Sequence, residues 1–350
     1  MKGLILSGGY GTRLRPITYS HQKQLIPVAN KPILFYAIED VLEAGVEEIG
    51  IIVGPNKEQV MATVQSQDWD AEIVFIPQDE PRGLAHTILI ADKFLDDEFV
   101  MYLGDNILRE GIVKHANAFA GNNYDASIML TEVENPEQFG IAELNYDGTI
   151  KRLVEKPKVP PSNLALVGIY FFKPVITDAC NSIEPSWRDE LEITDAIQWL
   201  IDNGYEVGWT KVDRWWKDTG KPDDILEANR LILDDLSHEI LGEVNCELRG
   251  RVSVGKGTKV DEDSVIKGPA LIGSDCKITN GYIGPYTTIG NDCEIINAEV
   301  EDSIVMDSAK LINAGNIVDS IIGRGTIIEK NKSLPKGRKF VIGDTSWVRI

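Results

Sequence analysis

A glycine-rich string with basic side chains near the N-terminus is the first candidate for chemistry. It reads LSGGYGTRLRP over residues 6–16, and KQLIPV follows over residues 23–28. Closely spaced glycines let backbone N–H groups approach an anion, while Arg13 adds a fork of donors for phosphate oxygens and Lys23 a point charge. The string has neither a Walker A ending nor the G-x-G-x-x-G dinucleotide fingerprint. It therefore predicts a phosphate-binding loop of another kind, with a solvated glycine turn as the alternative.

The distribution of charge singles out the same segment. The 350 residues include 35 Lys or Arg and 55 Asp or Glu, a formal charge of −20. Residues 245–350 hold 14 acidic and 14 basic side chains, so residues 1–244 carry the whole excess, yet residues 1–38 hold five basic side chains and no acidic one. The overall acidity argues against nucleic-acid and membrane-surface binding. The basic island predicts a local site for small anions.

Short apolar runs that alternate with amphipathic segments must position this loop. Strands are predicted over 3–7, 49–53, 73–76 and 99–103, with helices over 32–44, from 57 and over 85–94. Continuous apolar runs of this length are typical of a sheet covered on both faces. The pattern predicts an α/β, Rossmann-like domain with a mixed, mostly parallel sheet. Ligands bind beyond the carboxyl ends of such strands, where residues 8–13 and 104–106 lie.

From about residue 245 an aliphatic residue recurs every six positions. The series continues after a slip of one residue and becomes looser toward the end: Leu248, Val254, Val260, Ile266, Ile272, Ile278, Ile283, Ile289, Ile295, Ile304, Leu311, Ile317, Ile322, Ile328. This period is typical of a parallel β-helix built from hexapeptide repeats, and an ordinary β-sandwich would not maintain it. We therefore expect two domains, 1–240 and 245–350, separated after a helix over 222–236.

Cysteine and histidine usage adds two expectations. The four cysteines, Cys180, Cys246, Cys276 and Cys293, lack CxxC spacing, which predicts buried free thiols in a reducing cytoplasm. No apolar run approaches membrane-spanning length. All four histidines precede the repeats, so the β-helix lacks the histidine base that acyltransfer commonly uses. We expect a structural tail that forms a homo-oligomer, a trimer, tetramer or hexamer, with acetyltransferase activity as the alternative.

The complete series of motifs resembles the sugar-phosphate nucleotidyltransferase family, and within it the long glucose-1-phosphate thymidylyltransferases that end in a left-handed β-helix. The resemblance covers roughly residues 1–235. Besides the N-terminal string it rests on Gln78 with PRGLA at 81–85, LGDN at 103–106, FG at 139–140, EKP at 155–157, VGIY at 167–170, RDELEITD at 188–195 and DTG at 218–220. Its specificity lies in the order of these motifs.

The resemblance implies a role for each matching residue. Catalytic roles fall to Arg13, Lys23, Lys156 and Arg188. Nucleotide binding falls to Leu6, Gly8, Gly9, Gly11, Thr12, Arg13, Gln24, Gln78, Gly83 and Asp105. Sugar-phosphate binding falls to Gly140, Glu155, Lys156, Gly168, Tyr170 and Arg188. Asp105 and Asp218 would hold Mg²⁺, a hard ion that prefers carboxylate and phosphate oxygens, although an isolated Asp at a strand end is usually a cap or turn residue.

The implied reaction joins an NTP and a sugar 1-phosphate, dTTP and glucose 1-phosphate above all, to give an NDP-sugar and pyrophosphate. A glutamine amide suits uracil as well as thymine, so a uridylyltransferase remains the nearest alternative. A non-catalytic regulatory subunit is another, although the phosphate- and metal-binding residues are present. Asp189 stands where the family often has glycine, and an extra carboxylate there weakens the role given to Arg188.

Overall fold

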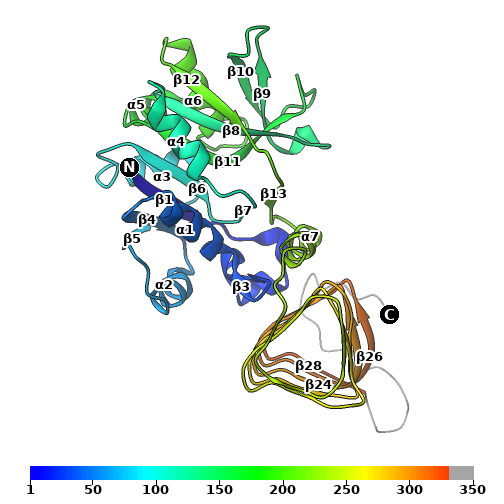
Figure 1. The fold of residues 1–350 in the computed structure, drawn as a ribbon. Coiled ribbons are helices and arrows are strands. Elements are labelled where there is room, and N and C mark those ends of the chain that lie inside the picture. The colour runs from blue at the N-terminus through cyan, green and yellow to red at the C-terminus, as the bar shows by residue number, and fades with distance from the viewer. Residues whose placement is uncertain (331–350) are drawn as a thin grey trace. The chain divides into compact units, whose positions relative to one another are not determined.

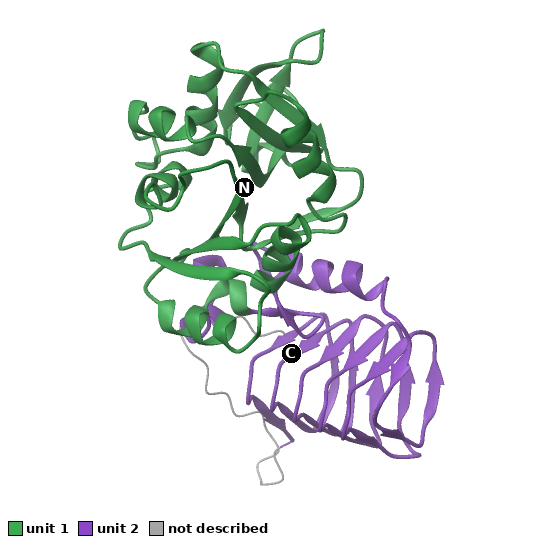
Figure 2. Ribbon diagram, turned by 60° about the vertical axis from the view of Figure 1, so that its left-hand side comes forward, with its two compact units in different colours: residues 1–10, 22–25, 33–218 green, residues 11–21, 26–32, 219–350 purple. Residues whose placement is uncertain are grey.

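The structure is a computed structural model that describes residues 1–330. It divides into two compact units (Figure 2): unit 1 comprises Met1–Tyr10, Gln22–Leu25 and Ile33–Asp218, and unit 2 comprises Gly11–His21, Ile26–Pro32 and the chain from Thr219 onward. None of the helices described has the length and apolarity that a membrane span requires. The division at residues 240–245 stays a prediction, and residues 331–350 of the predicted second domain lie outside the described residues.

Unit 1 contains a nine-stranded mixed sheet with helices on both faces (Figure 1). Its elements are β1 (Lys2–Ser7), α1 (Ile33–Glu43), β4 (Glu48–Val53), α2 (Lys57–Gln65), β5 (Glu72–Pro77), α3 (Leu84–Ile90), β6 (Phe99–Leu103), α4 (Val113–Gly121), β8 (Ala126–Glu132), β9 (Gly140–Leu144), β10 (Ile150–Glu155), β11 (Leu164–Phe172), α5 (Ile176–Ser182), α6 (Ile193–Asp202) and β12 (Val207–Lys211). The predicted α/β class and the predicted strands are confirmed.

The strand order creates the crevice in which such sheets bind ligands. β1 lies between β4 and β6 and is parallel to both. The chain thus leaves β1 toward one side and returns to its other side at β6, which is a topological switch point. Gly8 and Gly104 follow these two neighbouring strands, and the Gly104 N–H donates to the Leu6 carbonyl at 3.0 Å. The two motifs therefore meet at one edge of the sheet, as predicted.

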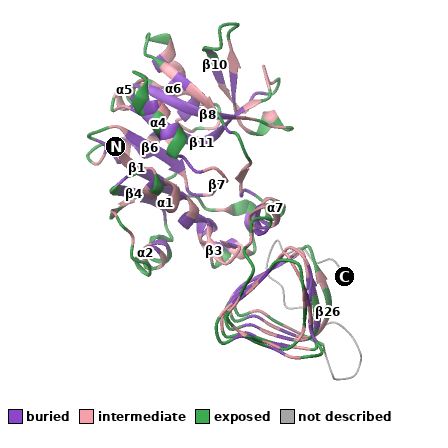
Figure 3. Cartoon of the chain, viewed as in Figure 1, coloured by how far each residue is buried: buried purple, intermediate pink, exposed green. Residues whose placement is uncertain are grey.

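Two apolar cores cover the faces of this sheet, and its central strands are largely buried (Figure 3). α3, α5 and α6 pack on one face with Leu4 and Leu6 of β1. α1, α2 and α4 pack on the other face with Ile5. Because neighbouring side chains of a strand point to opposite faces, an unbroken apolar run is what a strand covered on both sides needs. The continuous apolar run of β1 is therefore explained by the position of this strand between the two cores.

Unit 2 contains a short hairpin, one long helix and a parallel β-helix. Its elements are β2 (Pro27–Val28), β3 (Lys31–Pro32), α7 (Pro222–Leu233), β14 (Glu239–Ile240), β15 (Glu243–Val244), β16 (Glu247–Arg249), β17 (Val252–Val254), β18 (Lys259–Val260), β19 (Val265–Lys267), β20 (Ala270–Ile272), β21 (Lys277–Thr279), β22 (Tyr282–Ile283), β23 (Thr287–Ile289), β24 (Glu294–Glu301), β25 (Ile304–Val305), β26 (Lys310–Val318), β27 (Ile321–Ile322) and β28 (Ile327–Glu329).

The six-residue period is one side of a triangular coil (Figure 1). Leu248 pairs with Ile266, and Ile266 pairs with Ile283. The step from Leu248 to Ile266 spans three six-residue repeats. The step from Ile266 to Ile283 is one residue shorter, which accounts for the slip in the aliphatic period. The left-handed β-helix is thus as predicted. One repeat position differs: Val305, and not Ile304, pairs with Ile289 and joins the inner core.

Small side chains fill the corners of the β-helix, and the cysteines are part of this pattern. Cys276 and Cys293 are buried at equivalent positions of successive coils, since the Lys277 N–H donates to the Cys293 carbonyl at 2.8 Å. The Cys276 thiol donates to the Gly290 carbonyl at 3.0 Å. All four cysteines are free; Cys180 is also buried, whereas Cys246 is half-buried. The predicted burial is thus confirmed for Cys180, Cys276 and Cys293, whereas Cys246 is only partly buried.

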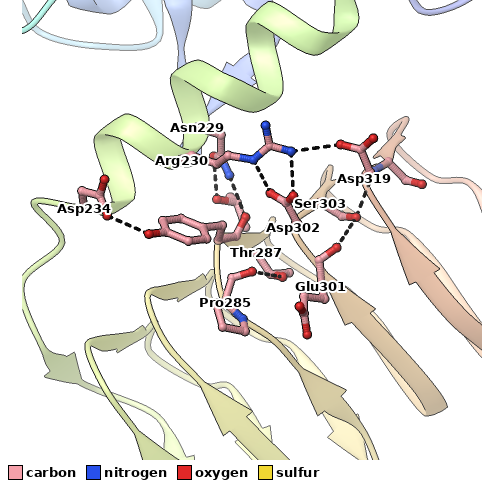
Figure 4. A network of polar contacts seen from close by, with 12 residues as sticks. Asn229, Arg230, Asp234, Pro285, Thr287, Glu301, Asp302, Ser303 and Asp319 are labelled. Carbon is pink, nitrogen blue, oxygen red and sulfur yellow. Dashed lines mark hydrogen bonds and ion pairs between the residues drawn. The ribbon is translucent and has the colours of Figure 1, made fainter. Parts of the chain in front are cut away.

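α7 is attached to one face of the β-helix by a network of polar contacts (Figure 4). Arg230 donates from Nε and Nη2 to the two oxygens of Asp302, both at 2.6 Å, and from Nη2 to Asp319 at 3.0 Å. The Tyr286 hydroxyl donates to Asp234 at 3.1 Å, just after the helix ends. These ion pairs lie at the edge of the contact, where water reaches them.

A buried amide lies at the centre of the same contact. Asn229 is 1% exposed, and its Oδ1 accepts from the Ala29 N–H at 2.9 Å and from the Thr288 hydroxyl at 2.8 Å. Its Nδ2 donates to the Tyr286 carbonyl at 3.1 Å. Asn30 adds a bond from its Nδ2 to the Ile289 carbonyl at 2.7 Å. Asn229 thus joins the hairpin, α7 and the β-helix.

Candidate active site

Two carboxylates and a lysine meet at the crevice of unit 1. Asp105 follows β6, and Asp218 ends β13 (Trp216–Asp218), which pairs antiparallel with β7 (Asn106–Leu108) so that Asp218 lies opposite Asn106. The Lys23 ammonium contacts Asp105 Oδ2 and lies 3.8 Å from Asp218 Oδ1. Lys23 is only 6% exposed. A buried ammonium between two carboxylates shows that this position favours a cation.

This donor set suits a divalent cation with phosphate ligands. Among residues 1–330, no group of three or more His, Cys, Asp and Glu side chains is arranged to hold a metal. Mg²⁺ is usually bound by one or two carboxylates, with substrate phosphates and water as the other ligands. A pair such as Asp105 and Asp218 therefore fits a cation whose remaining ligands are water or phosphate oxygens better than a structural ion held by protein groups alone.

Next to this pair, a cavity of about 150 Å³ contains most of the residues predicted for the sugar phosphate. It is lined by Asp105, Asp218 and, from the predicted sugar side, Gly140, Glu155, Lys156, Gly168 and Tyr170. Gly140 begins β9, Glu155 ends β10, and Gly168 and Tyr170 belong to β11, so three neighbouring strands supply the wall. The predicted metal and sugar-phosphate residues therefore share one cavity, with the exception of Arg188.

Glu155 is an acid of this cavity whose pKa is shifted by its surroundings. Burial, and after it the charge of Glu192, raise the pKa of its carboxyl, while Lys156 and Arg188 lower it. Its Oε1 lies 3.6 Å from Lys156 Nζ, and its Oε2 accepts from the Thr194 hydroxyl at 3.4 Å. Each oxygen of a carboxylate can accept more than one hydrogen bond, so Glu155 can accept from a further donor, such as a hydroxyl group.

Arg188 contacts the cavity through Glu155. Its guanidinium lies 3.5 Å from Glu155, 3.0 Å from Glu190 and 3.3 Å from the buried Glu192. Three carboxylates compensate its charge, so a phosphate would have to compete with them. Asp189 has a φ of 62°, a left-handed conformation that glycine adopts freely and Asp tolerates. The left-handed backbone conformation thus explains why Asp189 can stand where the family often has glycine.

A second buried cluster holds the backbone that follows β1. Gln22 Nε2 donates to the Ser7 carbonyl at 2.9 Å and the Gly9 carbonyl at 3.0 Å, and it contacts Gln24 Oε1 at 2.9 Å. Both glutamines are 4% exposed. Gln22 therefore shapes the backbone of the glycine string near Leu6, Gly8 and Gly9, and its role could not be read from the motif.

Gln78 follows β5 and lies against the same backbone. A Cβ on Gly8 would come within 2.7 Å of Gln78 Oε1, so any larger residue there would displace the Gln78 amide. Gln78 Nε2 lies 3.3 Å from His86 Nδ1. Burial, and after it the charge of Arg82, lower the pKa of His86, so its ring is neutral and can accept. Gly83, with a φ of 102°, precedes α3.

The remaining predicted phosphate residues belong to unit 2. Gly11, Thr12 and Arg13 begin a 3-10 helix, η1 (Thr12–Leu14). The Arg13 guanidinium packs on Gly220, where a Cβ would come within 3.1 Å of it. The Thr18 hydroxyl donates to the Gly11 carbonyl at 2.7 Å. The predicted phosphate-binding string is thus shared between the two units.

Two residues that the motifs did not assign also line the cavity. Trp216 donates from its indole nitrogen to Asn106 Oδ1 at 2.6 Å, and its ring meets Phe139 edge to face at 5.5 Å. Asn106 is 2% exposed and donates to Asp105 Oδ1 at 3.0 Å. The LGDN string contains Asn106, but only the pairing of β7 with β13 brings Trp216 to it.

Comparison with known proteins agrees with this geometry. Residues 2–235 match the family described as nucleotidyl transferase. The chain is 46% identical to the low-salt glycan biosynthesis nucleotidyltransferase Agl11 of Haloferax volcanii, over 100% of both chains. It is also 46% identical to a glucose-1-phosphate thymidylyltransferase of Streptomyces antibioticus, over 100% of this chain and 99% of the relative. A crystal structure assigned as a glucose-1-phosphate thymidylyltransferase of Bacillus anthracis matches with a TM-score of 0.63 at 32% identity, over 68% of this chain and 97% of that one.

Proposed function

The chain belongs to the nucleotidyl transferase family, and on that premise we propose that it transfers a thymidylyl group from dTTP to glucose 1-phosphate. The products are dTDP-glucose and pyrophosphate. The observation that carries this proposal is the cavity that Asp105 and Asp218 share with Glu155 and Lys156. A cation-binding pair at one end and a carboxylate–ammonium pair at the other suit a metal–nucleotide and a sugar phosphate side by side.

The reaction needs no nucleophile from the protein. An oxygen of the sugar phosphate forms a bond to the α-phosphorus of dTTP, the bond from that phosphorus to the bridging oxygen of the β-phosphate breaks, and pyrophosphate leaves with the electron pair. Catalysis then consists of alignment and charge stabilisation. Lys23 supplies a buried positive charge next to the metal pair, and in this proposal it contacts the reacting phosphates.

The substrates are divided between the residues as the motifs suggest. Arg13 grips the β- and γ-phosphates and stabilises the departing pyrophosphate, together with the backbone at Gly8, Gly9, Gly11 and Thr12. Lys156 holds the phosphate of the sugar, and Arg188 assists if that phosphate displaces its carboxylate partners. Glu155 accepts hydrogen bonds from sugar hydroxyls, next to Gly140, Gly168 and Tyr170. Gln78 and Gly83, with the main chain at Leu6 and Gly8, hold the base, and Gln24 belongs to the same nucleotide site.

Asp105 and Asp218 are the residues that would hold Mg²⁺. When bound, the ion neutralises phosphate charge and fixes the orientation of the triphosphate. The position of the Lys23 ammonium between the two carboxylates supports this assignment, because it marks a place where positive charge is favourable.

The β-helix serves structure and assembly in this proposal. His238 precedes its first strand, and the Val252 N–H donates to His238 Nδ1 at 3.3 Å, so this imidazole is already engaged. The balanced charge of residues 245–350 lets copies approach each other without strong repulsion. We propose a homo-oligomer that acts in the cytoplasm, and the four free cysteines agree with a reducing compartment.

A pyrophosphate-release assay across the common NTPs and hexose 1-phosphates tests the proposal. The highest kcat/KM is expected for dTTP with glucose 1-phosphate, and Asp105→Asn should abolish turnover while the fold remains intact. Because one methyl group discriminates by only about 1–3 kcal/mol, measurable turnover with UTP is also expected. A preference for UTP would make the chain a uridylyltransferase, and no turnover with any pair would refute nucleotidyl transfer.

A further inference from the structure

The carboxylate of Asp105 has both of its oxygens engaged, by two different neighbours. Lys23 contacts Oδ2, on the side that faces Asp218. The amide of Asn106 donates to Oδ1 at 3.0 Å. The orientation of this carboxylate thus depends on how the Asn106 amide is turned.

Trp216 determines the orientation of that amide. An indole N–H can only donate, and Trp216 donates to Asn106 at 2.6 Å. The atom of Asn106 that receives this bond must therefore be the carbonyl oxygen Oδ1, so the NH₂ group faces Asp105. Asn106 is 2% exposed, so its amide is largely shielded from solvent. A flipped amide would bring two donors together at Trp216 and two acceptors together at Asp105.

One two-stranded ribbon, formed by β7 and β13, supplies Asn106, Trp216 and Asp218. In the pairing of β7 with β13, Asp218 lies opposite Asn106 and Trp216 lies opposite Leu108. The ribbon that brings Asp218 to the site therefore also brings Trp216 to Asn106. The contact of Trp216 with Phe139 holds the ring from another side.

We propose that Asn106 and Trp216 are positioning residues that hold the Asp105 carboxylate in the orientation that binds the divalent cation. This rests on the proposed function, because it takes Asp105 and Asp218 as the metal pair. Partners that orient a metal ligand commonly change metal affinity by about 10–100-fold when they are removed. Loss of either residue weakens the hold on Asp105 Oδ1 and leaves Lys23 at Oδ2 as the contact that orients the carboxylate.

Direct Mn²⁺ binding tests the proposal without reference to turnover. Free Mn²⁺ would be measured by electron paramagnetic resonance during titration of the full-length protein with Mn²⁺ alone. We expect Trp216→Phe, which keeps a ring against Phe139, and Asn106→Ala each to weaken binding by about 10–100-fold. Trp215→Phe is the matched control, since Trp215 lies next in the chain but does not line the cavity. Thermal unfolding would confirm that each variant is folded.

A second measurement separates positioning from a direct role in the reaction. Raising Mg²⁺ from limiting to saturating concentration should increase the kcat of Trp216→Phe by a larger factor than the kcat of wild type, because the variant requires more metal. The change in Mg²⁺ dependence, and not kcat itself, is the readout, since Trp216 also lines the cavity. Wild-type Mn²⁺ affinity in both variants would overturn the proposal, and so would a wild-type protein that binds no Mn²⁺ at millimolar concentrations. Unchanged Mn²⁺ binding by Asp105→Asn would overturn the metal pair itself. Weakened Mn²⁺ binding in a protein that turns over no substrate pair would instead refute only the proposed function.

Discussion

At the scale of single residues, burial decides what Glu155 contributes. Its pKa is raised chiefly by burial, so the folded protein binds this proton more tightly than the unfolded chain does. The ionised carboxylate therefore lowers the free energy of unfolding at neutral pH. This loss of stability disappears as the pH falls through the raised pKa of the folded protein toward the ordinary pKa of Glu in the unfolded chain. The protein keeps a destabilising charge at a place where a sugar hydroxyl can use it.

Glu155→Gln should therefore separate stability from function. At pH 8 we expect a higher unfolding temperature than wild type, with a difference that narrows as the pH falls. The KM for the sugar phosphate should rise roughly tenfold, as for the loss of one hydrogen bond to a charged group. In wild type the KM should also rise on acidification. Phosphate itself titrates near pH 6 and changes the KM of both proteins. The ratio of the wild-type KM to the KM of Glu155→Gln should therefore be plotted against pH. A constant ratio would contradict a role for the ionised Glu155.

Lys23 allows a comparison of rate with stability. Lys23→Ala should lower kcat about 10²–10³-fold, the loss typical of one charge-stabilising donor. The free energy of unfolding should change by only about 1 kcal/mol, because Asp105 and Asp218 are partly exposed, at 22% and 31%, and water can solvate them. Steady-state kinetics and urea unfolding measure the two effects, with Lys23→Arg as the charge-keeping control. A stability loss above about 3 kcal/mol with a small change in rate would indicate a structural lysine.

At the scale of elements, burial also ranks the contacts between α7 and the β-helix. Asn229→Ala leaves the Ala29 N–H, the Thr288 hydroxyl and the Tyr286 carbonyl without their partner. It should cost about 2–3 kcal/mol, because unpaired buried polar groups keep their full desolvation penalty. Arg230→Ala removes ion pairs that water reaches and should cost about 1 kcal/mol or less.

Urea unfolding of Asn229→Ala and Arg230→Ala, monitored with a signal that reports on the β-helix, would test which substitution lowers the free energy of unfolding more. Thr288→Val is a further control, since it removes one partner of Asn229 and should cost less than Asn229→Ala. If Arg230→Ala proved the more damaging substitution, the ion pairs and not the buried amide would hold this contact together.

At the scale of the whole molecule, the extent of the family match and the compact units do not coincide. The match ends at residue 235, but α7 and residues 11–21 and 26–32 belong to the same compact unit as the β-helix. Within that unit, Asn229 and Asn30 each bond to the β-helix. The β-helix thus packs against α7 and the hairpin, which belong to the same compact unit as the segment that carries Arg13.

A chain that ends at residue 240 should therefore be impaired despite containing every predicted catalytic residue. We expect a lower unfolding temperature than the full chain and a Kd for dTTP at least several-fold weaker, because α7 and the hairpin lose their packing partner. Thermal unfolding and calorimetric titration would measure both, with the full-length chain as reference. Wild-type stability and affinity in the short chain would show that residues 1–240 fold as an independent domain.

The sequence by itself determined the features that depend on local pattern. Apolar runs and amphipathic segments predicted the sheet and its helices, and the aliphatic period predicted the β-helix, because side-chain direction follows backbone geometry residue by residue. The glycines with Arg13 and Lys23 predicted a phosphate site, since few backbones other than glycine-rich turns expose their N–H groups to an anion.

Only the tertiary structure decided which of these residues meet. Nothing in the spacing of Asp105 and Asp218 encodes the pairing of β7 with β13 that brings them around Lys23. The bond from Trp216 to Asn106 and the three carboxylates around Arg188 likewise join residues through long-range packing. Local pattern sets what a residue can do, but the register of strands that are distant in sequence sets its partners. Those partners fix its charge, its orientation and hence its chemistry.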